Sequence, residues 1–308
     1  MPRIRIALVG IGKIARDQHV PALAANAEFE LVAGVSRHHR LDGVPNFLEL
    51  SELLEGPPAV DAVAICTPPQ VRYEIACQAL DAGLHVMLEK PPGASLNEVE
   101  SLRERAAASR ATLFATWHSR AAAGVAPARR LLEGRRVQRV RINWKEDVRV
   151  WHPGQTWIWQ AGGLGVFDPG INALSIVTHI LPERLHLTRA TLNFPSNCET
   201  PIAAELSLAG ERGAAALMSL DFLHEGPPAW DIDVEHDGGR LRLSRGGAVL
   251  AVGDEAPVEA PDDEYLNLYR RFAELVNGRQ SDVDVEPLRL VADAFLCGRR
   301  HIVAPFNE

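Results

Sequence analysis

The chain has 308 residues, 46% of them hydrophobic, which is enough for two domains with separate cores. It carries 40 acidic and 32 basic residues, and its net charge of -8 argues against an extended contact with nucleic acid or with an anionic membrane. No run of about 18 consecutive apolar residues offers a membrane helix. We therefore expect a cytoplasmic protein with a small-molecule partner.

A glycine-rich turn follows the first predicted strand, at residues 4–9. It reads Gly10-Ile11-Gly12-Lys13-Ile14-Ala15 and continues into a helix that reaches residue 25. This G-x-G-x-x-A pattern between a strand and a helix is typical of a dinucleotide-binding turn, in which the glycines let the backbone approach a pyrophosphate at the helix N-terminus. We predict that Gly10, Gly12, Lys13 and Ile14 contact the cofactor.

The second predicted strand, residues 29–37, ends where NAD-binding proteins carry an acidic residue for the adenosine ribose. Here the chain has Ser36 and Arg37. A hydroxyl and a guanidinium suit a ribose 2′-phosphate, so we predict that NADP is preferred and NAD tolerated. The alternative is that Arg37 is an ordinary solvated loop arginine.

Strands and helices continue to alternate up to about residue 118, with apolar strands near residues 59–66, 84–90 and 111–117. This alternation predicts a Rossmann domain, with a doubly wound parallel sheet, over residues 1–118. Ligands bind at the carboxyl ends of such strands, where Thr67, Pro68, Glu89 and Lys90 fall.

Lys90 stands immediately before a pair of prolines in the stretch "LEKPPG". Because Pro91 cannot donate to a sheet ladder and disfavours helix at the preceding residue, the chain must leave the strand at Lys90. We predict that Lys90 points its ammonium toward the nicotinamide. The alternative is a strand-end lysine that extends to water.

The alternation ends after residue 118, and segments with period-two patterns follow, together with two helices at residues 263–278 and 286–300. We predict a second domain over residues 119–308, of the α+β class, with an open and largely antiparallel sheet. The overall fold class is thus α/β with a second α+β domain.

The stretch from Trp144 to Leu181 concentrates four of the six tryptophans. A tryptophan face suits the C–H face of a sugar ring, while carboxylates, imidazoles and amides bind its hydroxyls. We predict a carbohydrate pocket here, although some tryptophans are expected only to pack in the core or at a subunit interface. The candidate substrate-binding residues are Glu146, His152, His118, Trp151 and Trp230. His118 and Trp230 lie outside this stretch and are equally compatible with packing roles.

Asp168 opens a predicted helix, as its N-cap, with Pro169 at the first helical position. Asn172 lies four residues further on, about one turn along, so the two side chains can point to the same side. Capping alone would explain an aspartate here. No metal is expected, because Glu146 and His152 lack a third ligand and the four cysteines form no C-x-x-C pair.

With the glycine turn, Thr67-Pro68-Pro69, Glu89-Lys90-Pro91 and the aspartate-led helix in this order, the chain resembles the Gfo/Idh/MocA oxidoreductase family over essentially its whole length. The resemblance implies that Lys90 contacts the reacting hydroxyl near the nicotinamide. It also implies a homodimer or a higher homo-oligomer, assembled through the open sheet of the second domain.

Two positions depart from the common family pattern. Asn172 replaces the histidine of Asp-x-x-x-His, and Arg72 stands where many members have histidine. The stretches "WKEDVRVWHPGQ" and "GVFDPGIN" are similar to a branch of the family that oxidises L-arabinose or D-galactose at C1. This similarity implies a function in carbohydrate metabolism, the oxidation of an anomeric C1 hydroxyl to an aldonolactone with NAD(P)+.

An anomeric hydroxyl is more acidic than an ordinary alcohol, so a carboxylate can accept its proton as hydride leaves. We predict that Asp168 is this base, that Lys90 and Asn172 position O1, and that Glu146 and His152 hold ring hydroxyls. Two alternatives remain open: a dehydrogenase of inositol or another cyclic polyol, and a non-catalytic NADP-binding sensor. The sequence does not rank the aldoses.

Overall fold

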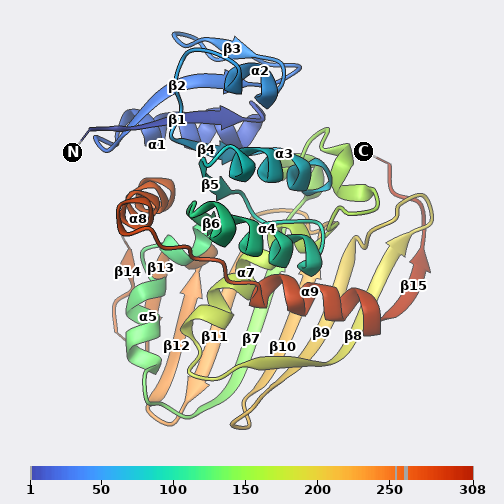
Figure 1. Cartoon of the computed structure of the whole chain (residues 1–308). Coiled ribbons are helices and arrows are strands. Elements are labelled where there is room, and N and C mark those ends of the chain that lie inside the picture. Colours follow the sequence, from blue (N-terminus) through green and yellow to red (C-terminus); the bar gives the residue numbers. More distant parts are fainter. Residues whose placement is uncertain (1, 254, 260–262, 308) are drawn as a thin grey trace. The chain divides into compact units, whose positions relative to one another are not determined.

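The computed structural model describes residues 2–253, 255–259 and 263–307, and the chain forms two compact units (Figure 1). The first unit comprises the residues up to His118 together with Tyr265–Val285. The second comprises Ser119–Glu264 and the residues from Glu286 onward. This division differs from the predicted second domain, 119–308, because residues 265–285 return to the first unit.

The first unit contains a six-stranded parallel sheet with the order β3-β2-β1-β4-β5-β6, the order of the Rossmann fold. Its strands are buried apolar segments; in β4, all four residues are buried. The strands are β1 (Ile4–Val9), β2 (Phe29–Val35), β3 (Asn46–Phe47), β4 (Ala62–Ile65), β5 (His85–Leu88) and β6 (Leu113–Ala115). The helices are α1 (Val20–Ala24), α2 (Leu50–Leu54), α3 (Pro69–Asp81), α4 (Leu96–Ser109) and, from Tyr265 onward, α8 (Glu264–Gly278).

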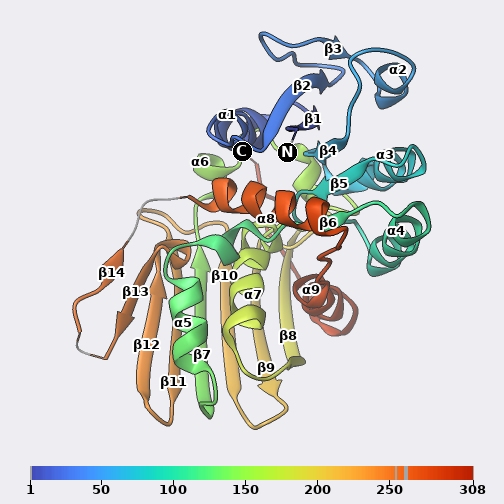
Figure 2. The ribbon, with the colours of Figure 1, turned by 60° about the vertical axis from the view of Figure 1, so that its left-hand side comes forward.

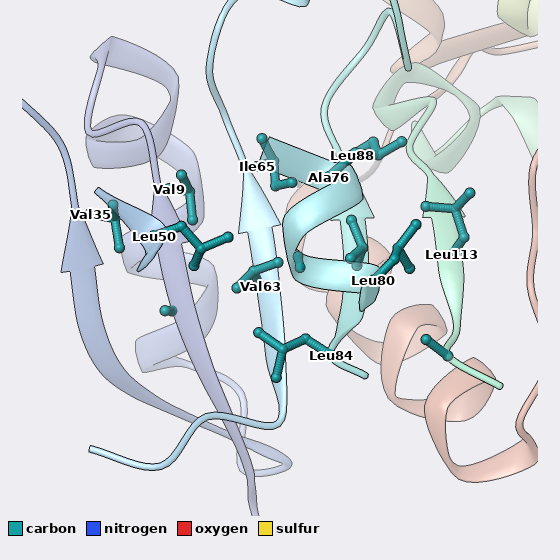
Figure 3. Close-up of a cluster of buried hydrophobic side chains, with 14 of the residues drawn as sticks. Val9, Val35, Leu50, Val63, Ile65, Ala76, Leu80, Leu84, Leu88 and Leu113 are labelled. Carbon is teal, nitrogen blue, oxygen red and sulfur yellow. The ribbon is translucent and has the colours of Figure 1, made fainter. Parts of the chain in front are cut away.

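Apolar side chains fill both faces of this sheet, as expected for parallel strands covered by helices on two sides. On one face, Val63 and Leu88 of the strands pack with Leu80 of α3, and Figure 3 shows the side chains gathered there. On the other face, Phe272 of α8 stacks on Phe29 at 5.8 Å and on Phe114 at 6.1 Å between ring centroids. The apolar stripe of α8 therefore completes the core of the first unit.

The second unit contains a nine-stranded mixed sheet with the order β14-β13-β12-β11-β7-β10-β9-β8-β15. Most neighbours are antiparallel, while β10–β7 and β15–β8 are parallel. The strands are β7 (Val137–Lys145), β8 (Leu185–Pro195), β9 (Ala203–Gly210), β10 (Ala215–Asp221), β11 (Ala229–His236), β12 (Gly239–Ser244), β13 (Val249–Val252), β14 (Val258–Glu259) and β15 (Arg299–Val303). This sheet and the Rossmann sheet confirm the predicted fold class.

Helices α5 (Val125–Leu132), α7 (Phe167–Ile180) and α9 (Glu286–Cys297) run along the sheet of the second unit (Figure 2). The strands alternate accordingly: in β10, buried Ala216, Met218 and Leu220 alternate with residues that are at least partly exposed. This alternation is what a sheet with one covered face requires. A short helix, α6 (Val148–Trp151), follows β7. Among the helices of the described residues, none is long and apolar enough to cross a membrane.

Candidate active site

The glycine turn of the first unit has the geometry of a dinucleotide-binding turn. Gly10 has a φ of +89°, and a Cβ there would lie 2.8 Å from the backbone nitrogen of Thr67, so only glycine fits. A Cβ on Gly12 would meet no atom of the described residues within 4 Å, so the backbone is open to a ligand at this point. Residues 13–24 are helical, with a π-helical segment at Ala15–His19.

A buried hydroxyl stands beside this turn. Within residues 2–253, 255–259 and 263–307, Thr67 Oγ1 is buried and has no hydrogen-bond partner. A buried polar atom of this kind is available to a bound ligand. Together with the open backbone at Gly12, it shows that these residues fit a nicotinamide dinucleotide at the carboxyl ends of β1 and β4. The predicted cofactor contacts at Gly10, Gly12 and Thr67 remain predictions.

The other predicted cofactor residues lie on the surface of the same unit. Ile14 is 37% exposed, and the ammonium of Lys13 pairs with Asp17. At the end of β2, Ser36 Oγ accepts the backbone N–H groups of two following residues, and Arg37 Nε donates to Glu49 Oε1 at 2.6 Å. Arg37 is thus a solvent-exposed cation that shares a carboxylate.

The strand-end loops after β4 and β5 are joined by Arg72, the residue that departs from the family pattern. Arg72 lies on α3 and is buried. Its guanidinium donates to the backbone carbonyls of Thr67, Glu89 and Pro91. A planar guanidinium with several donors suits this arrangement, which the single donor of a neutral imidazole could not reproduce. Arg72 therefore fixes the backbone on both sides of Lys90.

Glu89 is the centre of a buried polar cluster that sequence reasoning did not predict. Its Oε1 accepts from His19 Nε2 and from the hydroxyl of Tyr265, both at 2.9 Å, and the other imidazole nitrogen lies 2.7 Å from the hydroxyl of Tyr269. Burial tends to raise the pKa of Glu89, but the hydrogen bond and charge of His19 outweigh it and lower the pKa to about 2.

The same contacts act on the partners of Glu89. Burial tends to lower the pKa of His19, yet interactions with Cys66, Tyr269 and Glu89 raise it well above its ordinary value. Burial raises the pKa of Tyr269 to about 12. These contacts favour the charged forms of both Glu89 and His19. The only sequence signal for this cluster is a histidine in the helix of the glycine turn and two tyrosines four residues apart on α8.

Lys90 and His118 adjoin this cluster. The backbone N–H of Lys90 donates to Glu89 Oε2 at 3.0 Å, and the residue is partly exposed. The ring of His118 stacks on Tyr265 with 5.6 Å between centroids. His118 therefore reaches Glu89 through Tyr265, and the first unit positions two of the predicted site residues at the end of its sheet.

In the second unit, Glu146 joins two of the predicted sugar-binding residues. It follows β7, is 2% exposed, and accepts from His152 Nε2 at 2.8 Å and from Trp230 Nε1 at 2.7 Å. Trp151 lies across Trp230 with 4.7 Å between ring centroids and is 42% exposed. The structure therefore brings together Glu146, His152, Trp151 and Trp230.

Asp168 and Asn172 lie on α7. Asp168 was predicted as the N-cap of this helix, but the helix begins at Phe167 and Val166 is the N-cap, so Asp168 lies within the first turn. Asp168 is 3% exposed, and its Oδ2 is 3.7 Å from His152 Nδ1. Asn172 is partly buried one turn further along. Capping therefore does not explain this aspartate.

Two of the remaining tryptophans of the segment, Trp144 and Trp159, pack. Trp144 is 4% exposed, and Trp159 lies against Phe222 and Phe306 with centroids 5.7 and 5.1 Å away. These contacts are the packing roles expected for part of the set. Among the residues that the structure describes, no group of three histidine, cysteine, aspartate or glutamate side chains could hold a metal ion. The four cysteines are free thiols.

Comparison with known proteins places this arrangement in a family. Residues 4–116 match the family model described as an oxidoreductase family with an NAD-binding Rossmann fold. A galactose 1-dehydrogenase of Pseudomonas fluorescens is 49% identical over 310 aligned residues, covering 100% of both chains. The chain belongs to the Gfo/Idh/MocA oxidoreductase family.

Solved structures of other proteins agree with this membership. The D-galactose-1-dehydrogenase of Rhizobium etli superposes with a TM-score of 0.95 at 51% identity, covering 100% of this chain and 99% of that one. A 3-ketoreductase of Actinomadura kijaniata, described with NADP, has a TM-score of 0.85 at 21% identity and covers 98% and 100%, which shows a shared fold. The Gfo/Idh/MocA resemblance seen in the sequence is confirmed, and with it an NAD(P)-binding Rossmann fold.

Proposed function

We propose that the chain is an NAD(P)+-dependent aldose 1-dehydrogenase that oxidises the C1 hydroxyl of D-galactose, L-arabinose or both to the aldonolactone. The observation that carries the proposal is the buried cluster of Glu146, His152 and Asp168, in a chain similar over its full length to two galactose 1-dehydrogenases. Polar groups beside a tryptophan pair, of which Trp151 is exposed, are the groups that a pyranose needs.

NAD(P)+, held at the glycine turn of Gly10 and Gly12, would supply the acceptor for the hydride that leaves C1. Asp168 takes the proton of the C1 hydroxyl, and its burial keeps water from competing for that position. Lys90 and Asn172 orient O1, while Glu146 and His152 hold ring hydroxyls. Trp151 and Trp230 support the apolar face of the sugar. Arg72 and Glu89 hydrogen-bond to the backbone at and beside Lys90, and they thereby hold the Lys90 side chain in position toward O1.

For the cofactor, we propose a preference for NADP over NAD. Arg37 offers an exposed guanidinium at the end of β2, and Ser36 offers a hydroxyl. Both suit a 2′-phosphate. Gly10, Gly12, Lys13, Ile14, Thr67, Pro68, Glu89 and Lys90 complete the proposed cofactor contacts.

We also propose that the enzyme is a cytoplasmic homodimer or higher homo-oligomer. The four free thiols fit a reducing compartment. Leu217, which is 54% exposed on β10, lies on the solvent-facing side of the nine-stranded sheet, and we assign the contact with a second subunit to this side. Light scattering coupled to size exclusion measures the mass, and a monomer would contradict this part.

The function is tested by initial rates of NADP+ and NAD+ reduction with D-galactose, L-arabinose, D-xylose, D-glucose and myo-inositol, and by NMR identification of the product. We expect turnover with galactose or arabinose and a 1,5-lactone as the first product. Turnover with myo-inositol alone would assign a cyclic polyol dehydrogenase. Tight NADP+ binding with no turnover of any compound would favour a sensor.

A further inference from the structure

The imidazole of His152 lies between two buried carboxylates of the second unit. Its Nε2 is 2.8 Å from Glu146 Oε1 and its Nδ1 is 3.7 Å from Asp168 Oδ2. The three side chains are 15%, 3% and 5% exposed, respectively. The ring also packs against Phe222, with 5.5 Å between centroids. A histidine with carboxylates on both sides is more than a donor to a sugar hydroxyl.

Glu146 fixes the tautomer of this histidine. A carboxylate only accepts hydrogen bonds, and both oxygens of Glu146 are already used, one by His152 and one by Trp230 Nε1. The neutral imidazole therefore carries its proton on Nε2 and turns the lone pair of Nδ1 toward Asp168. Once Asp168 carries the proton of the substrate, its O–H can donate to Nδ1, and a shift of roughly 0.5–1 Å would bring Oδ2 and Nδ1 to hydrogen-bond distance.

After it has taken the proton of the substrate, Asp168 needs a neighbouring group that can accept this proton. Asn172, one turn along α7, carries an amide that does not titrate, so it cannot take a proton from the base. The charged groups that face His152 in the described contacts are Glu146, from the end of β7, and Asp168 itself. On helix α6, which ends just before His152, Arg149 is paired with Asp147.

We propose that Glu146, His152 and Asp168 form a proton relay, in which His152 Nδ1 receives the proton that Asp168 takes from the substrate. The relay rests on the proposed function. As the C1–H bond breaks, its electron pair leaves with the hydride to NAD(P)+; the O1–H bond breaks, the C1=O bond forms, and the proton goes to Asp168. Asp168 then passes that proton to Nδ1, and the resulting imidazolium is stabilised by Glu146 until it releases the proton to water.

The first test is the pH dependence of kcat/KM for D-galactose in His152→Gln, with His186→Gln as the matched control. His186 is exposed on β8 of the same unit. Because only neutral His152 can accept a proton, the acid limb of the wild-type profile reports the relay. In His152→Gln we expect kcat to fall on the order of 10-fold or more, and the limb to move to lower pH. The control variant His186→Gln should retain the wild-type kcat and the wild-type position of the acid limb.

A second variant keeps the hydrogen-bond acceptor but removes the charge. Glu146→Gln no longer stabilises the imidazolium, so the acid limb should also move to lower pH. Thermal unfolding of each variant checks that it is folded. A higher KM with an unchanged limb in both variants would overturn the relay and leave His152 as a sugar contact.

The third measurement does not need turnover. The ring C–H resonances of His152, assigned by their loss in His152→Gln, are titrated by NMR without sugar or cofactor in the wild type, Asp168→Asn and Glu146→Gln. We expect the midpoint to fall in both variants, and an unchanged midpoint in Asp168→Asn would overturn the relay. Failure of the wild type to oxidise any sugar would overturn the proposed function and the relay together, whereas wild-type turnover with an unshifted limb overturns the relay alone.

Discussion

Each unit contains a histidine bonded to a buried glutamate, but the two pairs are completed in different ways. In the first unit, both nitrogens of His19 lie within 2.9 Å of a partner oxygen, and its side chain is 1% exposed. In the second unit, His152 Nε2 is bonded to Glu146, while Nδ1 is 3.7 Å from Asp168 and the side chain is 15% exposed.

The difference separates two uses of the same residues. A pair with short contacts at every nitrogen holds one protonation state and one geometry, which suits the support of Lys90 through Glu89. A pair with one long contact and some access to water can change its protonation state, which suits proton transfer. We call the first the closed pair and the second the open pair.

The largest effect is expected at Asp168, the carboxylate 3.7 Å from Nδ1 of the histidine in the open pair. Asp168→Asn keeps the shape of the side chain but removes the proposed base, so kcat should fall about 10²- to 10⁴-fold. Steady-state kinetics with D-galactose measure this loss. Asp237→Asn, an exposed carboxamide substitution in the same unit, is the control. A loss of less than threefold in Asp168→Asn, by a rough limit well below that range, would remove Asp168 from the base role.

Breaking the closed pair should instead cost stability. His19→Phe leaves Glu89 buried without its cationic partner, and loss of one partner of a buried ion pair destabilises a protein by roughly 3–5 kcal/mol. Urea unfolding measures the free energy of unfolding. His39→Phe, at an exposed position in the same unit, should change it little. Equal stabilities of the two variants would contradict the assignment of the closed pair.

The closed pair also predicts how stability depends on pH. The pKa of Glu89 is lowered from 4.5 to about 2, so its contribution is present above pH 4.5 and is lost as the pH falls toward 2. The pKa of His19 is raised above 6.5, so its contribution is present below pH 6.5 and is lost as the pH rises through the raised value. Urea unfolding of the wild type from pH 3 to 9 should show a maximum between these limits.

The matched variant for this pH dependence is Glu89→Gln. Its amide cannot ionise, so the loss of stability on acidification that comes from Glu89 should be absent. If wild type and Glu89→Gln lost stability in parallel between pH 5 and 3, the ionised state of Glu89 would not stabilise the fold.

A smaller effect should sharpen the description of the open pair. Trp230→Phe keeps an aromatic ring but removes the N–H donor to Glu146, and a hydrogen bond to a charged group contributes roughly 1.5–3 kcal/mol. We expect the KM for D-galactose to rise about tenfold or more, with a lesser change in kcat. Trp159→Phe, a packing tryptophan, is the control for loss of ring area. Similar KM values in the two variants would contradict a role for the indole N–H.

The smallest effect on stability is expected outside both pairs, at Arg37 and Glu49. This ion pair is 70% and 49% exposed, so Arg37→Ala should change stability by less than about 1 kcal/mol. The same variant should lower kcat/KM for NADP+ about tenfold, through loss of a charged hydrogen bond, and leave that for NAD+ nearly unchanged. Equal losses with both cofactors would rule out a contact of Arg37 with the 2′-phosphate.

Local patterns predicted much of this molecule. The alternation of apolar strands with helices predicted the parallel sheet, and the ends of β4 and β5 placed Thr67, Glu89 and Lys90 at one edge. The cluster around Glu146 was expected only as a set of sugar-binding residues, because the contact between His152 and Asp168 depends on the path of the loop between α6 and α7.

The closed pair was beyond such reasoning. His19 is a single histidine in a short helix, and its partner Tyr269 follows it by 250 residues. The periodicity of the apolar residues on α8 is compatible with the core of either unit. The spacing of these residues therefore could not predict that α8 packs in the first unit. Arg72 was noticed only as a departure, because three backbone carbonyls leave no signature in the sequence.

The return of α8 has a consequence for the order in which the chain is synthesised. When residue 118 leaves the ribosome, all six strands of the first sheet are present, but Tyr265, Tyr269 and Phe272 are not yet translated. While most of the second unit is being synthesised, Phe29 and Phe114 therefore lack their contact with Phe272. Glu89 lacks the hydrogen bond from the hydroxyl of Tyr265. The amino-terminal unit is the first to appear and cannot be the first to be finished.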